Sequence, residues 1–441
     1  MAILILPSLP NNLNRTFNKI LIMLPLKTVT SSLVTFVIGL LVMFFQPVYA
    51  QVNGCTDPLA NNFNSLATVN DGSCTYSPTN YQPIVKANPI SDELTETSGL
   101  QMAGNFLWSF NDSGGEPAIY RLDTITGLVL QKVILQNATN MDWEDIAFDG
   151  ISFYIGDFGN NFNGARTDLK IYKFPFRAIP DYVNYPVTTI AATQIEIINF
   201  TYSDQPQPPV PATNNNTKFD CEAMIADGGK IHLFTKNWVD INTTHYEING
   251  VTAGTYIATP QETLVTNYLV TAADKAYGQK IIVLLGYDKS FPYTHHFNLL
   301  TSYNGSTYFS GNKRKIDLPN AGTMGQGEGI CFRTGTYGYI SNEKINFPAI
   351  SQKLHSFNIS NFITNAAPVY TFYGTGNWSQ PSNWSNNIAP PPTIVSGSEI
   401  IIDPLPGGQC ILNIPYTIPA GVRLIITVAK DFVVQGNLTI Q

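Results

Sequence analysis

Short runs of alternating apolar and polar residues, separated by glycine, proline and asparagine, fill the chain from about residue 95 to residue 362. Runs of about four to eight such residues between turn signals predict β-strands. One unit recurs: an acidic residue, a short apolar run, a glycine turn, and a second strand rich in aromatic residues. The copies begin at Thr97, Trp143, Cys221, Thr271 and Gly327, and the first copy lacks the acid.

The spacing of these copies predicts the architecture. Three of the four intervals are 45, 52 and 54 residues, and the fourth, of 78, contains the Pro- and Asn-rich insertion 205–216. About four strands in such a period are typical of a β-propeller blade. We therefore expect an all-β fold with a five-bladed propeller over residues 90–364. A sixth blade would need the segment 181–204, and a sandwich would not explain the recurrence in register.

The recurring acids suggest a site. The first strand of each blade lines the channel of a propeller, so acids at the start of that strand are expected to converge at one mouth. The predicted ring contains Glu144, Glu222, Asp274 and Glu328, with Asp112, Asp157 and Glu343 nearby. Close carboxylates need a compensating cation or protons, and hard oxygen donors favour calcium. The alternative is that these acids accept hydrogen bonds from backbone N–H groups of neighbouring blades.

The first fifty residues have the pattern of an export signal. Arg15, Lys19 and Lys27 precede an apolar stretch at 33–45, and no acidic residue occurs before Ala50. A basic start, a short apolar core and a small residue at the break predict a signal peptide, residues 1–50. An apolar stretch of about 13 residues is too short to span a membrane as a helix. We expect a secreted or cell-surface protein with no membrane span after cleavage.

Residues 51–80 form a short module bounded by two cysteines. The segment is rich in turn-forming residues and lacks strand or helix periodicity, so a disulfide between Cys55 and Cys74 is expected to hold it together. Cys221, Cys331 and Cys410 have no metal-ligand spacing and are expected to be buried free thiols. The module's oxygen donors suggest either a second calcium site or side chains that cap their own turns. They are Asp57, Asn62, Asn64, Asn70 and Asp71.

The module and the propeller region each resemble known sequences. The pattern Cys-Thr-Asp-Pro to Asp-Gly-Ser-Cys, residues 55–74, resembles a short repeat of secreted Bacteroidetes proteins. The phrases at 108–114, 142–147, 156–161, 219–223 and 326–330 resemble a family of uncharacterised secreted bacterial propellers, and more distantly the calcium-dependent phytase-type propellers. Asn160 departs from that pattern, because relatives tend to have Asp there. The resemblance implies an exported propeller and leaves its biochemical role open.

Composition and charge exclude several classes of protein. Only 12% of the residues are charged, against roughly 25% in average soluble domains, which argues against coiled coils and helical repeats. The net charge is −7 and no run of Lys or Arg occurs, so a nucleic acid partner is not expected. No nucleotide-binding glycine loop or nucleophile motif such as Gly-x-Ser-x-Gly is present.

The segment 370–441 changes pattern and is expected to be a separate β-rich piece, a β-repeat or β-sandwich-like domain. Trp378 and Trp384 could stack on sugar rings, although core packing is the favoured interpretation. The segment resembles strand-turn repeats near the ends of secreted Bacteroidetes proteins, usually followed by a sorting domain for type IX secretion. No sorting tail is visible, so we expect the sequence to be a fragment, the alternative being a partner that covers the edge.

Two functions fit these features. The favoured one is a calcium-stabilised, non-catalytic binding module for a glycan or protein ligand at the cell surface. The rival is a metal-dependent phosphoesterase that uses the acidic mouth and basic side chains to hold phosphate. The candidate basic residues are Arg166, Lys236 and Lys275, of which Arg166 and Lys236 are the predicted binding residues in either function.

Overall fold

The computed structural model describes residues 51–441 apart from 277–278, 348, 365–367, 385–387, 395–397, 406, 421 and 428–429. The chain divides into two units, residues 1–51 and 52–441. The predicted signal peptide, residues 1–50, lies outside the described residues. No helix in the described part is long and apolar enough to cross a membrane. The helices there are η1 (Asp92–Leu94), η2 (Phe176–Ala178), η3 (Ala192–Gln194), η4 (Tyr308–Ser310), α2 (Ala321–Met324), η5 (Ser360–Phe362) and η6 (Pro381–Asn383).

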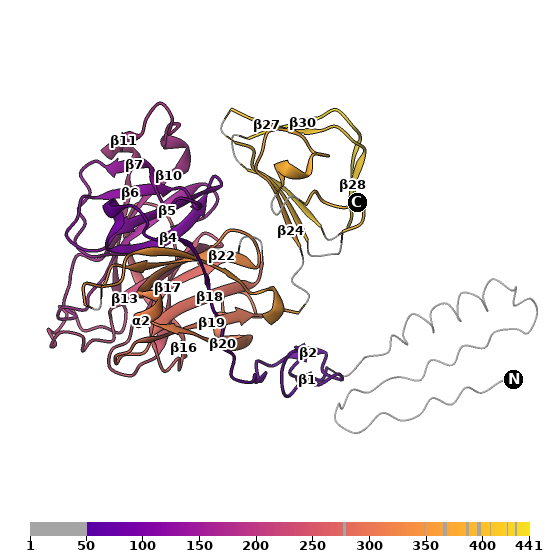
Figure 1. Cartoon of the computed structure of the whole chain (residues 1–441). Coiled ribbons are helices and arrows are strands. Elements are labelled where there is room, and N and C mark those ends of the chain that lie inside the picture. Colours follow the sequence, from indigo (N-terminus) through magenta and orange to yellow (C-terminus); the bar gives the residue numbers. More distant parts are fainter. Residues whose placement is uncertain are drawn as a thin grey trace, which may run out of the picture. The chain divides into compact units, whose positions relative to one another are not determined.

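Residues 84–358 form a five-bladed β-propeller, drawn in indigo through orange in Figure 1. Each blade is a meander of four antiparallel strands. From the innermost strand outwards, blade 1 contains β4 (Thr97–Ala103), β5 (Phe106–Asn111), β6 (Ala118–Leu122) and β7 (Val129–Leu135), and blade 2 contains β8 (Trp143–Phe148), β9 (Ser152–Asp157), β10 (Lys170–Pro175) and β12 (Glu196–Tyr202). Blade 3 contains β13 (Cys221–Asp227), β14 (Lys230–Thr235), β15 (Thr243–Ile248) and β16 (Gly254–Leu264), and blade 4 contains β17 (Leu269–Lys275), β18 (Ile281–Tyr287), β19 (Thr294–Thr301) and β20 (Asn312–Asn320). Blade 5 contains β21 (Gln326–Phe332), β22 (Tyr337–Glu343), β23 (Lys353–Asn358) and β3 (Ile84–Ala87).

The ring closes with a strand from the other end of the propeller sequence. The N-terminal strand β3 pairs antiparallel with β23 and is the outer strand of the last blade. The inner strands contact one another in the order β4, β8, β13, β17 and β21, and β21 contacts β4 again. The five predicted copies are these five inner strands, so the predicted propeller is confirmed.

The segment 181–204 supplies edge strands and no sixth blade. Strand β11 (Val187–Ile190) adds in parallel to β7, which gives blade 1 a fifth strand. Strand β12 pairs in parallel with β16, which joins the outer edges of blades 2 and 3 into one sheet of eight strands. These additions cover sheet edges that would otherwise present unpaired backbone groups.

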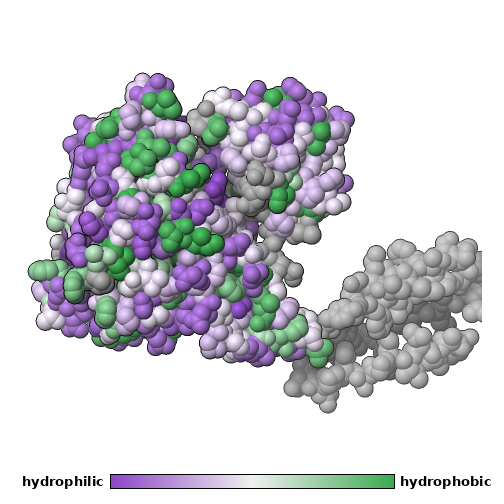
Figure 2. All heavy atoms as spheres, in the orientation of Figure 1, coloured by the Kyte–Doolittle hydropathy of each residue, from purple (hydrophilic) through white to green (hydrophobic). Residues whose placement is uncertain are grey.

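Each blade is apolar on both faces because each face packs against a neighbouring blade. In β18, Ile282 and Leu284 pack in one core cluster with Phe234 of blade 3. The alternate residues Val283 and Leu285 pack in another cluster with residues of blade 5. Alternation of side chains along a strand produces this division. The face seen in Figure 2 is mainly hydrophilic, with separate apolar patches.

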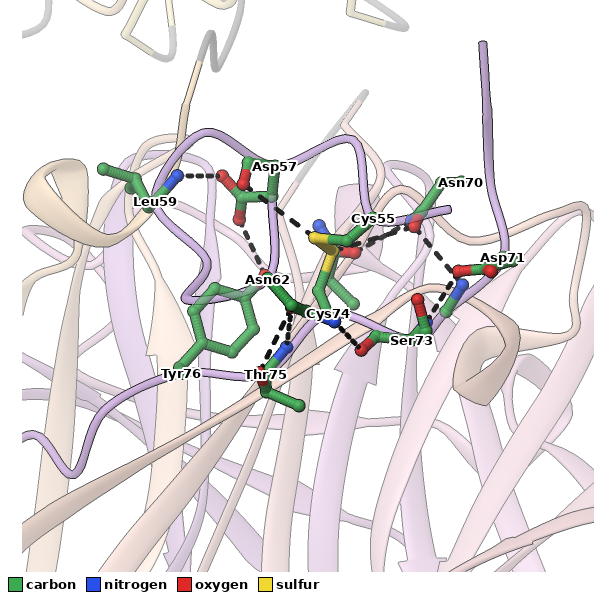
Figure 3. Close-up of a disulfide and its surroundings, with 12 residues drawn as sticks. Cys55, Asp57, Leu59, Asn62, Asn70, Asp71, Ser73, Cys74, Thr75 and Tyr76 are labelled. Carbon is green, nitrogen blue, oxygen red and sulfur yellow. Dashed lines mark hydrogen bonds between the residues drawn. A yellow bond between two sulfur atoms is a disulfide. The ribbon is translucent and has the colours of Figure 1, made fainter. Parts of the chain in front are cut away.

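The N-terminal module contains the predicted disulfide between Cys55 and Cys74, which is confirmed (Figure 3). Two short parallel strands, β1 (Asn53–Gly54) and β2 (Val69–Asn70), pair within it. Asp57, Asn62, Asn64, Asn70 and Asp71 all use side-chain oxygens to accept hydrogen bonds from backbone N–H groups of the module. The turn-capping alternative therefore describes the geometry of this module.

The C-terminal piece, yellow in Figure 1, is a β-repeat in which the strands pair in parallel. Its strands are β24 (Val369–Phe372), β25 (Gly376–Asn377), β26 (Glu399–Ile402), β27 (Gln409–Leu412), β28 (Tyr416–Ile418), β29 (Arg423–Ile426), β30 (Asp431–Val434) and β31 (Leu438–Ile440). The sheets are β24-β26-β29, β25-β27-β30 and β28-β31. Successive turns stacked in this way form a β-helix, so of the two predicted forms the β-repeat is present and the sandwich is absent from the described residues.

Trp378 and Trp384 belong to the core of this β-helix. Both indoles are fully buried, and their ring centroids are 4.6 Å apart in an edge-to-face arrangement. The Nε1 of Trp384 donates to the carbonyl of Trp378 at 2.6 Å. A sugar ring has no access to either indole, so the favoured core interpretation describes them and the stacking role does not.

Candidate functional site: an acidic mouth of the propeller

Each inner strand has a β-bulge near its start, and the side chain of the bulged residue lies at one end of the channel. The strand pairing shifts register at Glu144 in β8, at Glu222 in β13 and at Glu328 in β21. A bulge re-aims the side chain of the extra residue. The same end receives Asp112, which follows β5, and Glu343, which ends β22.

We call this end the acidic mouth. Each carboxyl group in it lies close enough to at least one other for charge repulsion. It consists of the carboxyl groups of Asp112, Asp142, Glu144, Asp220, Glu222, Glu328 and Glu343.

Asp274 does not belong to this mouth, and the predicted alignment of β17 is wrong. The bulge in β17 lies at Thr271, which takes the place of the glutamates, and its hydroxyl donates to the Gly327 carbonyl at 3.0 Å. Asp274 comes three residues later, and its carboxylate accepts a hydrogen bond from the Phe332 N–H at 2.6 Å. It lines a cavity of about 510 Å³ with Asp227, at the end of β13, and Lys275. The repeat spacing alone did not reveal which residue bulges.

Three carboxyl groups of the acidic mouth form a tight cluster. The carboxylate oxygens of Asp112, Asp142 and Glu144 lie within 4.8 Å of one another. Glu144 is 5% exposed, and no described residue donates a hydrogen bond to its carboxylate or to that of Asp142. Asp112 accepts one from the N–H of Ser113. Sequence reasoning misses Asp142 as a site residue, although it stands two residues before Glu144.

The electrostatics of the cluster reflect this lack of partners. Burial, with repulsion from Asp142, raises the pKa of Asp112 to about 7. Burial, with repulsion from Asp220, raises the pKa of Asp142 to about 6. Burial and then the neighbouring Glu222 hold the pKa of Glu144 well above its usual range. An added cation would stabilise the ionised forms of all three groups.

Gly159 leaves the space beside this cluster open. A Cβ atom at residue 159 would collide with Oε1 of Glu144 and with Oδ2 of Asp142. The backbone N–H of Gly159 donates to the carbonyl of Asp142 at 3.2 Å, which fixes the loop against the cluster. The absence of a side chain at residue 159 therefore lets these two carboxylates lie close to the backbone.

Glu222 and Glu328 of the predicted ring are paired within the protein, whereas the carboxylate of Glu343 accepts no hydrogen bond from a described residue. Glu222 forms an ion pair with the buried Lys236. Glu328 accepts hydrogen bonds from Tyr287 at 3.0 Å and from Gln326 at 2.6 Å.

Asp157 and Asp220 are also paired. Oδ1 of Asp157 accepts from Arg166 at 2.8 Å and from the N–H of Asp142 at 3.2 Å. Asp220 accepts from the indole of Trp238 and from the N–H of Asn160, both at 2.7 Å. The side-chain amide of Asn160 donates to the Phe219 carbonyl. Asn160 therefore has a structural role and is not a candidate metal ligand.

The predicted basic residues are likewise engaged. Arg166 binds Asp157 and Asp168, and Lys275 binds Asp227 at 2.5 Å. Burial by itself lowers the pKa of Lys236, but Glu222 and the other acids around it raise it well above its usual range. Lys236 is therefore held as an ammonium group. Cys221, Cys331 and Cys410 are buried free thiols, as predicted.

No protein-family model matches the chain, and the search among curated proteins finds no match. Solved structures with a propeller-type fold include an exo-β-1,3-galactanase from Phanerochaete chrysosporium, at 10% identity and a TM-score of 0.39, over 64% of this chain and 67% of that one. An α-L-arabinanase from Penicillium chrysogenum has 9% identity and a TM-score of 0.33, over 64% and 99%. An aldose sugar dehydrogenase from Streptomyces coelicolor has 11% identity and a TM-score of 0.34, over 62% and 96%. At these identities and TM-scores the likeness concerns the fold alone.

Proposed function

We propose that the protein is a secreted or cell-surface β-propeller that binds calcium at the acidic mouth and uses that mouth to bind a ligand, without catalysis. The observation that carries the proposal is the cluster of Asp112, Asp142 and Glu144, with its oxygens within 4.8 Å and the buried Glu144 unpaired. The disulfide of the N-terminal module supports an oxidising, extracellular setting.

The residues of the cluster fit a calcium ion. Calcium prefers about six to eight oxygen ligands from carboxylates, carbonyls and water. Asp112, Asp142 and Glu144 supply carboxylate oxygens, and the glycine at 159 keeps the adjacent space free of a side chain. The site has no Cys or His donor among the described residues, which argues against softer metals. Calcium would compensate the mutual repulsion of these groups.

Calorimetric titration of purified protein, first stripped with a chelator, tests the proposal. We expect one calcium to bind and to raise the melting temperature, because a ligand that binds only the folded state stabilises it by about 2.7 kcal/mol at 100 times its dissociation constant. Glu144→Gln should remove most of this stabilisation. Asp431→Asn, an exposed acid of the β-helix, is the matched control and should behave like wild type. A wild-type melting curve that calcium does not move would contradict the proposal.

The phosphoesterase alternative has less support from the site. A phosphate group would need a cation to receive it, and Arg166, Lys236 and Lys275 are each paired with a carboxylate. Assays of phosphate release from phytate and aryl phosphates, with calcium and with chelator, separate the two functions. Calcium-dependent turnover that is lost in the Glu144→Gln plus Glu222→Gln variant would replace the binding function with the catalytic one.

A further inference from the structure

The loops around the acidic mouth carry exposed apolar side chains. The end of β9 lies beside the start of β8, since Asp157 pairs with Trp143, so the loop after each second strand emerges at this mouth. The loop before each inner strand emerges at the same end. Exposed apolar side chains of these loops include Met141 (57%), Phe162 (75%), Val239 (45%), Phe291 (71%) and Phe347 (96%). We call these five residues the apolar rim.

Three of the five residues of the apolar rim are phenylalanines. The exposed phenylalanines of the described propeller are Phe162, Phe291 and Phe347, and all three belong to the rim. Exposed aromatic side chains are typical anchors of protein interfaces. Their arrangement around one mouth, with each on a different blade, points to a surface that binds a partner.

One rim residue, Phe291, is linked to the carboxylates through two tyrosine rings. The ring of Phe291 lies 5.9 Å from that of Tyr293, which lies 5.7 Å from that of Tyr287. The Tyr287 hydroxyl donates to Glu328 at 3.0 Å. Phe291 of the apolar rim is therefore linked to the acidic mouth through Tyr293 and the buried Tyr287.

The charge of the mouth selects the chemistry of the partner. The mouth contains seven carboxyl groups around one buried ammonium group, that of Lys236, and a nearby cation stabilises the ionised form of a carboxyl group. Lys236 shows how this mouth holds an ammonium group. Its Nζ contacts Glu222 and the Tyr287 hydroxyl and lies 5.1 Å from the ring centroids of both Trp238 and Tyr287.

The carboxyl groups of Glu144 and Glu343 accept no hydrogen bond from a described residue. Glu144 is buried, unpaired and directed into the mouth beside Asp112 and Asp142. The carboxylate of Glu343 accepts no hydrogen bond from a described residue, and it faces Glu328 and Asp112. A basic side chain would stabilise the ionised forms of Glu144 and Glu343, which a neutral sugar would not do.

We propose that the acidic mouth and its apolar rim form a docking surface for a protein segment that presents a lysine side chain between apolar residues. The ammonium group enters the mouth on the side of Glu343, and the apolar neighbours contact the rim. The inference rests on the proposed function only in using the same mouth as the binding site, and it does not require the calcium ion.

The test uses the full chain and a blocked synthetic pentapeptide with a central lysine, flanked on each side by a serine and a leucine. A second peptide has glutamine in place of lysine. We expect the lysine peptide to bind about tenfold or more tightly than the glutamine peptide, in calcium and in chelator. Glu343→Gln should weaken the lysine peptide about tenfold and leave the glutamine peptide unchanged.

The rim is tested with Phe291→Ser and Phe347→Ser, which should weaken both peptides severalfold. Ile125→Ser is the matched control, because Ile125 is 77% exposed in the loop between β6 and β7 at the opposite end. Melting curves of each variant establish that it is folded. Equal affinity for the two peptides would overturn the proposal, as would binding of neutral oligosaccharides that depends on the rim but not on Glu343. Loss of calcium binding alone would contradict the proposed function and leave this inference intact.

Discussion

Glu144 and Asp145 are neighbours in one inner strand, both buried, and they have opposite surroundings. Both oxygens of Asp145 are satisfied, by the N–H of Ile146 at 2.8 Å and by the N–H of Met224 in the next blade at 2.7 Å. The carboxylate of Glu144 receives no hydrogen bond from a described residue. Burial alone therefore does not distinguish a structural acid from one available to a ligand; the hydrogen-bond partners do.

Other acids of the channel also differ in whether they accept hydrogen bonds from the protein. Asp274 accepts from the Phe332 N–H of the next blade, as Asp145 does from Met224. These two acids fit the alternative in which carboxylates join neighbouring blades. Asp112, Asp142 and Glu144 have few or no donors and fit the calcium interpretation. Both interpretations from the sequence thus have residues to which they apply, at different depths of the channel.

The largest effect is expected from removing a satisfied acid. Asp145→Ala leaves the buried N–H groups of Ile146 and Met224 without an acceptor, at a cost of about 1–3 kcal/mol each. We expect the free energy of unfolding to fall by about 3 kcal/mol, measured by chemical denaturation in chelator. Glu144→Gln should leave it unchanged or raise it, because repulsion in the mouth decreases. A similar decrease in the free energy of unfolding of both variants would contradict the difference between Glu144 and Asp145.

Acidic pH is expected to lower the free energy of unfolding, because protonation of His295 removes a buried hydrogen bond. Burial lowers the pKa of His295 to about 4, and its Nε2 accepts the N–H of Gly327 at 2.9 Å, which requires the neutral ring. The folded pKa lies below the unfolded value of about 6.5, so this stability is present above pH 6.5 and is lost as the pH falls toward 4. We expect wild type to lose about 2 kcal/mol more than His295→Gln between pH 7 and pH 4.5. Parallel pH profiles of the two proteins would contradict this.

A smaller effect is expected at the edge of the unpaired cluster. Gly159→Ala adds a methyl group against Glu144 and Asp142 and should weaken calcium binding about tenfold, which is roughly 1.4 kcal/mol. Gly115→Ala is the matched control in another loop of the mouth, because its Cβ would meet no atom closer than 3.8 Å. Calorimetry measures both affinities. Equal affinities would show that the space beside Gly159 is not where calcium binds.

Much of the fold could be predicted from the sequence because it depends on the local alternation of apolar and polar residues. Strands with alternating apolar and polar residues, in a sequence motif that recurs along the chain, predict propeller blades. The five copies of the motif are the five inner strands. The position of Cys55 and Cys74 predicts the disulfide. The parallel pairing of the C-terminal strands was not predicted, since alternation along a strand does not state the direction of its neighbours.

The candidate site was predicted only in part. Glu144 and Asp112 lie in the cluster as expected, but Asp142 was missed and Asp274 lies at another depth. A single bulged residue changes which side chain points into the channel, and a bulge leaves no clear trace in a short apolar run.

By itself, the sequence determined an all-β chain, the order of the five repeated strands, and the residue types that gather along the channel, while the segment 181–204 left a sixth blade open. The tertiary structure decided which of these acids are satisfied and which are not. The physical reason is that strand formation depends on local alternation, whereas the state of a buried carboxylate depends on donors that the next blade brings from residues far away in the chain. Glu144 and Asp145 differ by one position in the sequence and by their whole set of partners in space.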